Sequence, residues 1–195
     1  IVNGPNRRRP RIVLKDLLQL DPAIDVLLNR VGASFVPSGR PAGDAVLQEI
    51  ERLAANAGPG DALVLFPEGA NFTPRRRERA IEKLEGSGRQ ELADKARELT
   101  HLLPPKPTGT VAAIAAAPTA TVLFVGHAGL EKMSTLGDIW RQLPMDNTID
   151  VKVWRYTPDE VPPADEQESW LYEQWATIDA WITECHRARA VEPAA

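Results

Sequence analysis

One carboxylate in this chain stands in a pattern that could do chemistry. The segment Phe66–Gly69 reads Phe-Pro-Glu-Gly; it follows the apolar run Ala62–Leu65 and precedes a helix start at Thr73-Pro74. A strand that ends in a fixed turn places side chains at the edge of a sheet, where α/β proteins commonly bind their substrates. Glu68 could there bind hydroxyl groups or orient a cationic partner. The alternative is a solvated glutamate in a tight turn.

Four arginines occupy the first turns of the helix predicted after Thr73. They are Arg75, Arg76, Arg77 and Arg79. Because the helix dipole disfavours cations at this end, such a cluster suggests a negatively charged ligand, and arginine binds phosphate with paired hydrogen bonds. The alternative is a solvated face neutralised by nearby glutamates; these are Glu78, Glu82 and Glu85. Since consecutive positions point around a helix, at most one or two of the arginines should reach a site.

The histidines and the cysteine exclude several kinds of site. The only histidines are His101, His127 and His186, and none has an aspartate five positions later. There is no Gly-x-Ser-x-Gly elbow and no glycine-rich phosphate loop. His127, at a predicted strand end, is either a site residue of a hydrolase-like enzyme or a hydrogen-bonded loop histidine. A single cysteine, Cys185, excludes an internal disulfide and a cysteine-based metal site.

The elements that must position these residues alternate along the chain. Strands are predicted at 11–14, 34–36, 62–66, 121–125 and 149–156, and helices at 17–28, 42–56, 73–85, 90–99, 110–117, 135–142 and 166–187. The runs at 62–66 and 121–125 are continuous and apolar, which is typical of strands buried on both faces. Strands separated by helices predict an α/β fold with a mostly parallel central sheet flanked by helices.

Length and composition fit one globular domain. The chain has 195 residues, of which 43% are hydrophobic and 26% are charged. We expect a single domain over 1–187, lacking its N-terminal part, and a frayed tail over 188–195. The net charge of −4 argues against a nucleic-acid partner. The longest apolar stretch, Val111–Val125, is broken by Pro118 and is too short to cross a bilayer.

Four segments occur in the same order as the motifs of a known family. They are Val13–Leu18, Asn29–Val36, Phe66–Pro74 and Leu102–Gly109. On these segments the chain resembles the glycerolipid (lysophospholipid) acyltransferases, the family of 1-acylglycerol-3-phosphate acyltransferase, and it is most similar to their lysocardiolipin-acyltransferase-like branch. The third segment matches the family's Phe-Pro-Glu-Gly motif, and the fourth is similar to its Pro-containing motif. The resemblance extends to about Trp181.

Three departures from the family's pattern affect what the resemblance implies. Ala70 stands where the family usually has threonine. Pro37–Gly39 separates the second motif from Arg40, the nearest candidate for its arginine. The family's catalytic His-x4-Asp pair, which lies upstream of the first segment, is absent from these residues. We therefore expect a truncated form that lacks the catalytic His and Asp, and an isolated chain that is inactive.

The resemblance implies transfer of an acyl group from an acyl thioester to a hydroxyl of a lysophospholipid or glycerol phosphate. The acyl donor would be acyl-CoA or an acyl carrier protein thioester, and no metal or bound cofactor is implied. The protein would be cytoplasmic and peripheral to the inner face of the cell membrane. The alternative is a non-catalytic lipid- or acyl-carrier-binding domain of the same fold.

The resemblance also implies which residues bind the acceptor. Glu68 and Gly69 would hold the glycerol-phosphate backbone, Lys15 and one arginine would neutralise its phosphate, and Pro104 would shape the pocket. The complete set of implied binding residues is Phe66, Pro67, Glu68, Gly69, Lys15, Arg40, Arg75 and Pro104.

Overall fold

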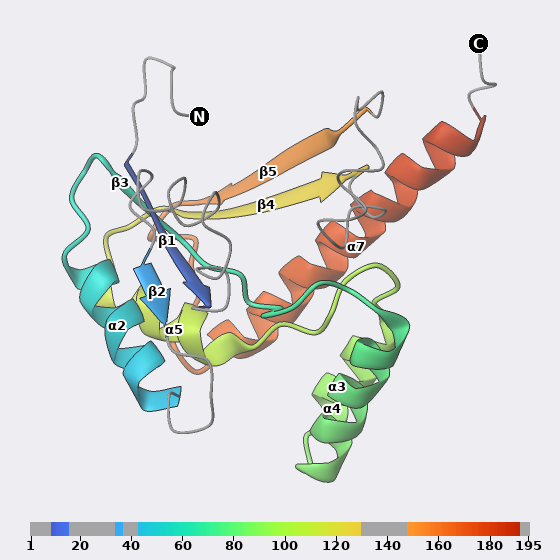
Figure 1. Cartoon of the computed structure of the whole chain (residues 1–195), viewed down its shortest axis with the longest axis horizontal. Helices are drawn as coiled ribbons and strands as arrows, with labels where there is room; N and C mark the ends of the chain where they lie inside the picture. Colours follow the sequence, from blue (N-terminus) through green and yellow to red (C-terminus); the bar gives the residue numbers. More distant parts are fainter. Residues whose placement is uncertain (1–8, 16–33, 37–42, 130–147, 192–195) are drawn as a thin grey trace. The chain divides into compact units, whose positions relative to one another are not determined.

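The computed structural model describes residues 9–15, 34–36, 43–129 and 148–191 (Figure 1). The chain forms two compact units. The first unit comprises Ile1–Pro67 and Lys106–Ala120, and the second comprises Glu68–Pro105 and Thr121–Ala195. Because the chain passes back and forth between them, the units are not consecutive domains. The expectation of one domain over 1–187 stays a prediction.

The first unit contains a small parallel sheet. Its strands are β1 (Arg9–Lys15), β2 (Ser34–Val36) and β3 (Asp61–Val64), in the order β2-β1-β3. Both neighbours run parallel to β1, with Leu14 opposite Phe35 and Ile12 opposite Val64. The β3 side chains are half-buried, so this strand is not enclosed on both faces as its apolar sequence predicted.

Two helices of the first unit pack against each other. They are α2 (Gly43–Ala55), which buries Ile50, Leu53 and Ala54, and α5 (Pro107–Ala116). A Cβ atom on Gly109 would lie 3.1 Å from Cδ1 of Ile50. The glycine therefore lets the start of α5 approach α2 closely.

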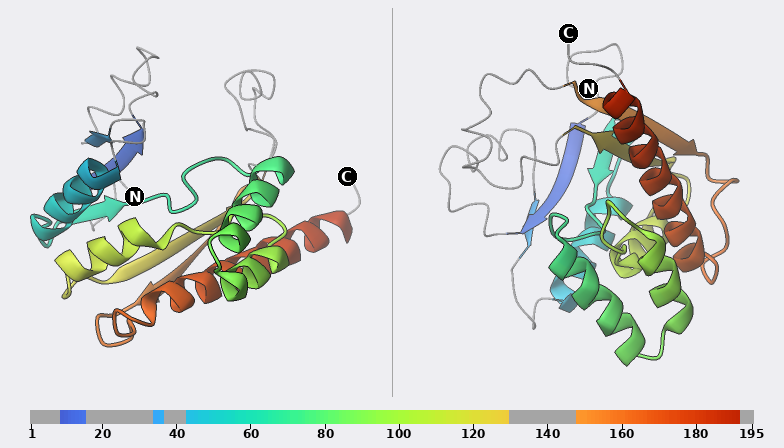
Figure 2. Two further views of the ribbon diagram at one scale, coloured as in Figure 1. Left: turned by 90° about the horizontal axis from the view of Figure 1, so that it is seen from below. Right: turned by 90° about the vertical axis from the view of Figure 1, so that its right-hand side faces the viewer.

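The second unit is built on a long helix and a two-stranded sheet. Strands β4 (Val122–Ala128) and β5 (Asp150–Tyr156) pair antiparallel, with Val125 opposite Val153. Helix α7 (Gln167–Val191) packs against this pair (Figure 2). Between them lies the main core of buried side chains, which comprises Leu99, Phe124, Ala128, Leu171, Trp175, Ile178 and Ile182.

A helical hairpin completes the second unit. Helices α3 (Pro74–Gly86) and α4 (Gln90–Glu98) lie side by side, and α4 contacts α7. Ile81 of α3 is buried against Ala93 and Ala96 of α4 and Tyr172 of α7. This contact fixes Ile81 on the inward face of α3, and the arginines on the opposite face are exposed.

The start of α3 agrees with the sequence. Thr73 is the N-cap, and its hydroxyl oxygen accepts a hydrogen bond of 3.2 Å from the N–H of Arg76. Pro74 occupies the first turn, where its missing N–H costs nothing. The helix ends at Gly86 and α4 begins at Gln90, close to the predicted ranges 73–85 and 90–99.

The predicted fold, an α/β fold with a mostly parallel central sheet flanked by helices, is wrong. The described strands form two separate small sheets, and one of these is antiparallel. In β4 the side chains of Phe124 and Ala128 are buried, whereas Leu123 and Val125 are 54% and 57% exposed. This alternation is typical of an antiparallel strand with one solvated face. The apolar run at 121–125 had suggested a doubly buried strand because its outward positions are also apolar.

Some predicted elements lie outside the described residues. These are the helices predicted at 17–28 and 135–142. Within the described ranges, no helix is both long and apolar enough to cross a membrane.

Candidate functional site

The Phe66–Gly69 turn is tied to a second segment of the chain by two hydrogen bonds. Strand β3 ends at Val64, so the turn begins two residues after it. The N–H of Lys106 donates to the carbonyl oxygen of Pro67 at 2.9 Å, and the N–H of Leu103 donates to Oε2 of Glu68 at 2.9 Å. The turn is therefore joined to the segment Leu102–Gly109. These are the two segments that resemble the third and fourth motifs of the acyltransferase family.

Gly69 gives the turn its shape. Its φ is +67°, in the left-handed region that side chains disfavour. A larger residue would be strained here, and the direction of the chain from Glu68 into α3 depends on this conformation.

Glu68 is a half-buried carboxylate with an altered proton affinity. Burial raises the pKa of its carboxyl above the ordinary value, the Leu103 N–H lowers it, and the charge of Asp179 raises it. The net effect on the pKa is upward. Oε2 is used by Leu103, and Oε1 has no hydrogen bond within the described part of the chain. That oxygen is free to accept from a ligand hydroxyl.

A second carboxylate, Asp179 of α7, holds the residues that precede Leu103. The side chain is only 5% exposed. It accepts hydrogen bonds from the N–H groups of Thr100 (3.0 Å), His101 (2.7 Å) and Leu102 (3.1 Å). It also accepts from the Thr100 hydroxyl at 2.8 Å. Asp179 and Glu68 together thus bind four consecutive backbone amides, and this loop is fixed from both sides.

The role of Asp179 was not predicted, although the residues around it carry a signal. Asp179 stands among Trp175, Ile178 and Ile182, all buried on the core face of α7. A single acid within an apolar helical face must find buried donors. Nothing in the local sequence, however, identifies the donors as amides about 80 positions earlier.

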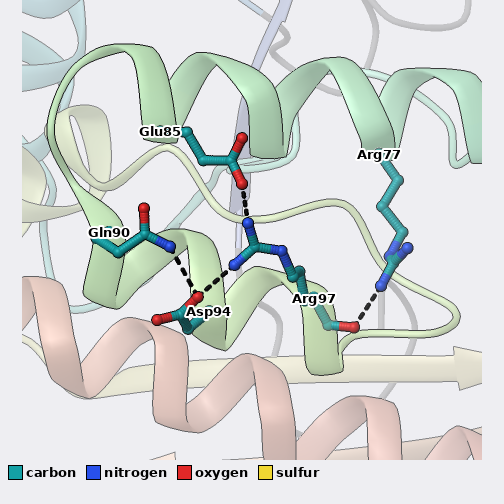
Figure 3. Close-up of polar contacts among 5 residues, drawn as sticks. All are labelled: Arg77, Glu85, Gln90, Asp94 and Arg97. Atoms are coloured by element: carbon teal, nitrogen blue, oxygen red, sulfur yellow. Dashed lines mark hydrogen bonds and ion pairs between the residues drawn. The ribbon is translucent and has the colours of Figure 1, made fainter.

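The arginines of the cluster differ in their contacts: Arg76 and Arg77 donate hydrogen bonds to backbone carbonyls, whereas Arg75 and Arg79 are exposed. Arg77 turns inward across the hairpin, where its Nη2 donates to the carbonyl oxygen of Arg97 (Figure 3). Its Nε donates to the carbonyl oxygen of Leu99 at 2.6 Å. These are carbonyls at the end of α4, which lack partners within the helix. Nη1 of Arg76 donates to the carbonyl of Asn71 at 3.0 Å. Arg77 is therefore committed to holding the hairpin together.

A network of charged side chains closes the same hairpin. Arg97 pairs with both Glu85 of α3 and Asp94 of α4, and Gln90 donates to Asp94 at 3.0 Å (Figure 3). Glu85, one of the glutamates expected to neutralise the arginine cluster, is thus paired with a different helix.

The exposed cations of α3 share one face. Arg75, Arg79 and Lys83 are four residues apart and solvent-exposed. None of the three forms an ion pair with any residue that the structure describes. Arg75, an implied phosphate ligand, is therefore available, but it points into solvent on a helix that begins after the turn.

The remaining implied binding residues are placed as follows. Phe66 is 60% exposed, and Pro104 is buried next to Leu103. Lys15 is the last residue of β1. Arg40 lies outside the described residues. The structure therefore brings together Pro67, Glu68 and the segment that contains Pro104.

The histidines lie in two different settings. His127 is exposed on β4 opposite Val151, and within the described residues its ring has no hydrogen-bond partner. His101 lies against α7: its Nε2 is 3.1 Å from the Thr183 hydroxyl, and its ring meets that of His186 at 4.7 Å. Because the Thr183 hydroxyl donates to the carbonyl of Asp179, His101 is the donor to Thr183. Among the described residues, neither His101 nor His127 is paired with an aspartate side chain.

Comparisons with known proteins do not add to these observations. The chain matches no protein-family model, no curated protein and no solved structure. In the described ranges, no group of three histidine, cysteine or acidic side chains is placed to hold a metal ion. A functional interpretation therefore depends on the motif resemblance and on the geometry of the Glu68 turn.

Proposed function

We propose that this chain carries the acceptor-binding part of an acyltransferase that acts on a lysophospholipid or glycerol phosphate. The observation that supports this is the pair of hydrogen bonds from Leu103 and Lys106 to the Phe66–Gly69 turn. They join two segments that, by resemblance, are separate motifs of one substrate site. A structural link between two such motifs is what a shared site requires.

In this proposal Glu68 binds the acceptor rather than reacting with it. Its Oε2 is held by Leu103, so the carboxylate has a fixed orientation and Oε1 can accept a hydrogen bond from a glycerol hydroxyl. An exposed arginine near the turn, Arg75, would pair with the acceptor's phosphate.

The reaction would form an ester bond between the acceptor oxygen and the acyl carbon, and break the carbon–sulfur bond of a CoA or acyl-carrier thioester. The hydroxyl proton must pass to a general base and then to the leaving thiolate. The 195 residues of this chain contain no His-x4-Asp pair to serve as that base. A binding domain without turnover, for lipid or for acyl carrier protein, is the second candidate, and the same absence favours it.

The test is binding of a monomeric acceptor. We expect the chain to bind 1-octanoyl-glycerol-3-phosphate in calorimetric titration and to bind 1-octanoyl-glycerol, which lacks the phosphate, more weakly. Replacing Glu68 by Gln keeps an acceptor for the Leu103 amide but removes the charge. Since a hydrogen bond to a charged group is worth roughly 1.5–3 kcal/mol, affinity should fall about 10- to 100-fold.

Glu98→Gln is the matched control. Glu98 is an exposed glutamate of the same unit with no ion pair or hydrogen bond among the described residues, so this change should leave affinity unaltered. Equal affinity of Glu68→Gln and wild type, or no binding of the phosphate compound at all, would contradict the proposal.

A further inference from the structure

The outer face of α3 carries a cluster of cations that the proposed acceptor site does not use in full. We define the basic stripe as Arg75, Arg76, Arg79 and Lys83. These residues are all exposed. At 3.6 residues per turn they fall within about 100° of one another, and they extend over about 12 Å of helix. The first turn of α3 contains no acidic residue.

Among the described residues of the second unit, no acidic side chain forms an ion pair with the basic stripe. Arg76 bonds to a neutral carbonyl, that of Asn71, and the other three cations form no ion pair in the described part of the chain. Glu78 and Glu82 lie on the adjoining face of α3 but not in ion-pair contact with the stripe, and Glu85 is paired with Arg97. The buried side of α3 is fixed by Ile81 and Arg77, so the stripe is held facing outward.

We propose that the basic stripe binds the anionic surface of a lipid bilayer and so brings the Glu68 turn to membrane-resident acceptor. This inference rests on the proposed function. No exposed residue of α3 is aromatic or a large aliphatic residue, whereas protein–protein interfaces depend on such residues as central anchors. A purely cationic stripe suits a surface of lipid phosphates, which attracts basic side chains without shape complementarity.

The position of the stripe in the chain agrees with this role. Only a short segment, 70–73, separates Glu68 and Gly69 from Pro74, the first residue of α3. A helix held against phosphates by Arg75 and Arg76 therefore keeps the Glu68 turn within a few residues of the membrane surface.

The test is co-sedimentation of the chain with vesicles. Wild type should bind vesicles of phosphatidylcholine and phosphatidylglycerol (3:1), bind pure phosphatidylcholine far less, and release as NaCl is raised. The variant is Arg79→Gln with Lys83→Gln, which leaves the implied acceptor residue Arg75 intact. Each basic residue near an anionic surface contributes roughly fivefold, so the double variant should bind roughly 30-fold more weakly.

The matched control is Arg155→Gln with Arg187→Gln. Both arginines are exposed in the second unit, away from α3, and the change in net charge is the same. Far-UV circular dichroism and the urea midpoint confirm that both double variants fold. The control should bind anionic vesicles like wild type.

Several outcomes would overturn the inference. These are equal weakening by the two double variants, equal binding of neutral and anionic vesicles, absence of vesicle binding, or displacement of the vesicles by single-stranded DNA at equal phosphate concentration. Titration of monomeric 1-octanoyl-glycerol-3-phosphate with Glu68→Gln reports on the proposed function separately. If binding of this acceptor depends on Glu68 but the chain does not bind vesicles, the membrane-binding role of the basic stripe is contradicted and the proposed function is not.

Discussion

At the scale of single residues, the binding role proposed for Glu68 conflicts with the partial burial of its carboxylate. A carboxylate that binds a ligand must keep an accessible oxygen, and Oε1 meets this need within the described structure. The same carboxylate is half-buried near Asp179, and both conditions disfavour its charge. The group is therefore expected to lower the stability of the folded chain at the pH at which it would bind a substrate.

The unfavourable burial of the charged Glu68 carboxylate predicts a pH-dependent effect of Glu68→Gln on stability. The folded-state pKa is raised above the ordinary value of 4.5, so the folded chain holds the proton more tightly than the unfolded chain does. The resulting stabilisation is complete below pH 4.5 and is lost as the pH rises through the raised value. Glutamine does not titrate, so the variant should gain stability relative to wild type as the pH rises.

Urea unfolding of wild type and Glu68→Gln at about pH 4 and pH 8 measures this effect. The difference in unfolding free energy between the two proteins should shift in favour of the variant at the higher pH. Glu98→Gln, at an exposed position, should show no such shift. A constant difference across this pH range would mean that the carboxyl of Glu68 is not desolvated.

At the scale of elements, the packing of α7 on β4 depends on a glycine. A Cβ atom on Gly126 would lie 3.0 Å from Cγ2 of Ile178 and 3.1 Å from the rings of Trp154 and Trp181. These neighbours are part of, or pack against, the main core, so they have little room to move. The glycine allows the helix to lie directly on the strand.

We expect Gly126→Ala to destabilise the second unit. Overpacking a filled core costs roughly 1–3 kcal/mol. Gly86→Ala is the control, because a Cβ there meets nothing within 4 Å and alanine favours a helix. The urea midpoints of both variants decide the matter, and similar midpoints for the two would contradict the packing argument.

The same elements show what the sequence could and could not predict. The start of α3 was predictable because Thr73 and Pro74 act on the backbone next to them. The helix predicted at 166–187 is confirmed as α7, because its helical pattern is long and continuous. Strand pairing was not predictable: whether β4 lies beside a parallel or an antiparallel neighbour depends on contacts far along the chain.

The residues of the candidate site also differ in how far the sequence alone could predict them. The Phe66–Gly69 motif marked Glu68 without any structure, because it is a local pattern. Its partner Leu103 contributes a backbone N–H, which every residue except proline has, so no side chain marks it in the sequence. Arg77 was predicted only as one of several arginines, and its role at the end of α4 follows from the geometry of the hairpin.

At the scale of the whole molecule, binding and turnover should separate. Mixed with 1-octanoyl-glycerol-3-phosphate and an acyl-CoA, the chain should release thiol no faster than a solution without protein. Positioned general-base catalysis is worth roughly 10²–10⁴-fold, and these residues lack the His-x4-Asp pair that would supply it. A thiol-trapping dye gives the rate.

The variant His127→Ala tests the alternative that the chain is a hydrolase-like enzyme. If thiol release or ester hydrolysis does occur and this variant abolishes it, the chain is a hydrolase-like enzyme that uses His127. The exposed position of His127 on β4, without a hydrogen-bond partner in the described residues, argues for no effect.

The contact between Asp179 and the loop before Leu103 also has a consequence for how the chain folds during synthesis. The amides of Thr100, His101 and Leu102 precede their carboxylate by 77 to 79 residues. When this loop leaves the ribosome, the helix that will hold it has not been made. The Glu68 turn can therefore acquire its final surroundings only after α7 has emerged, and until then a nascent chain leaves this loop open to chaperones and proteases.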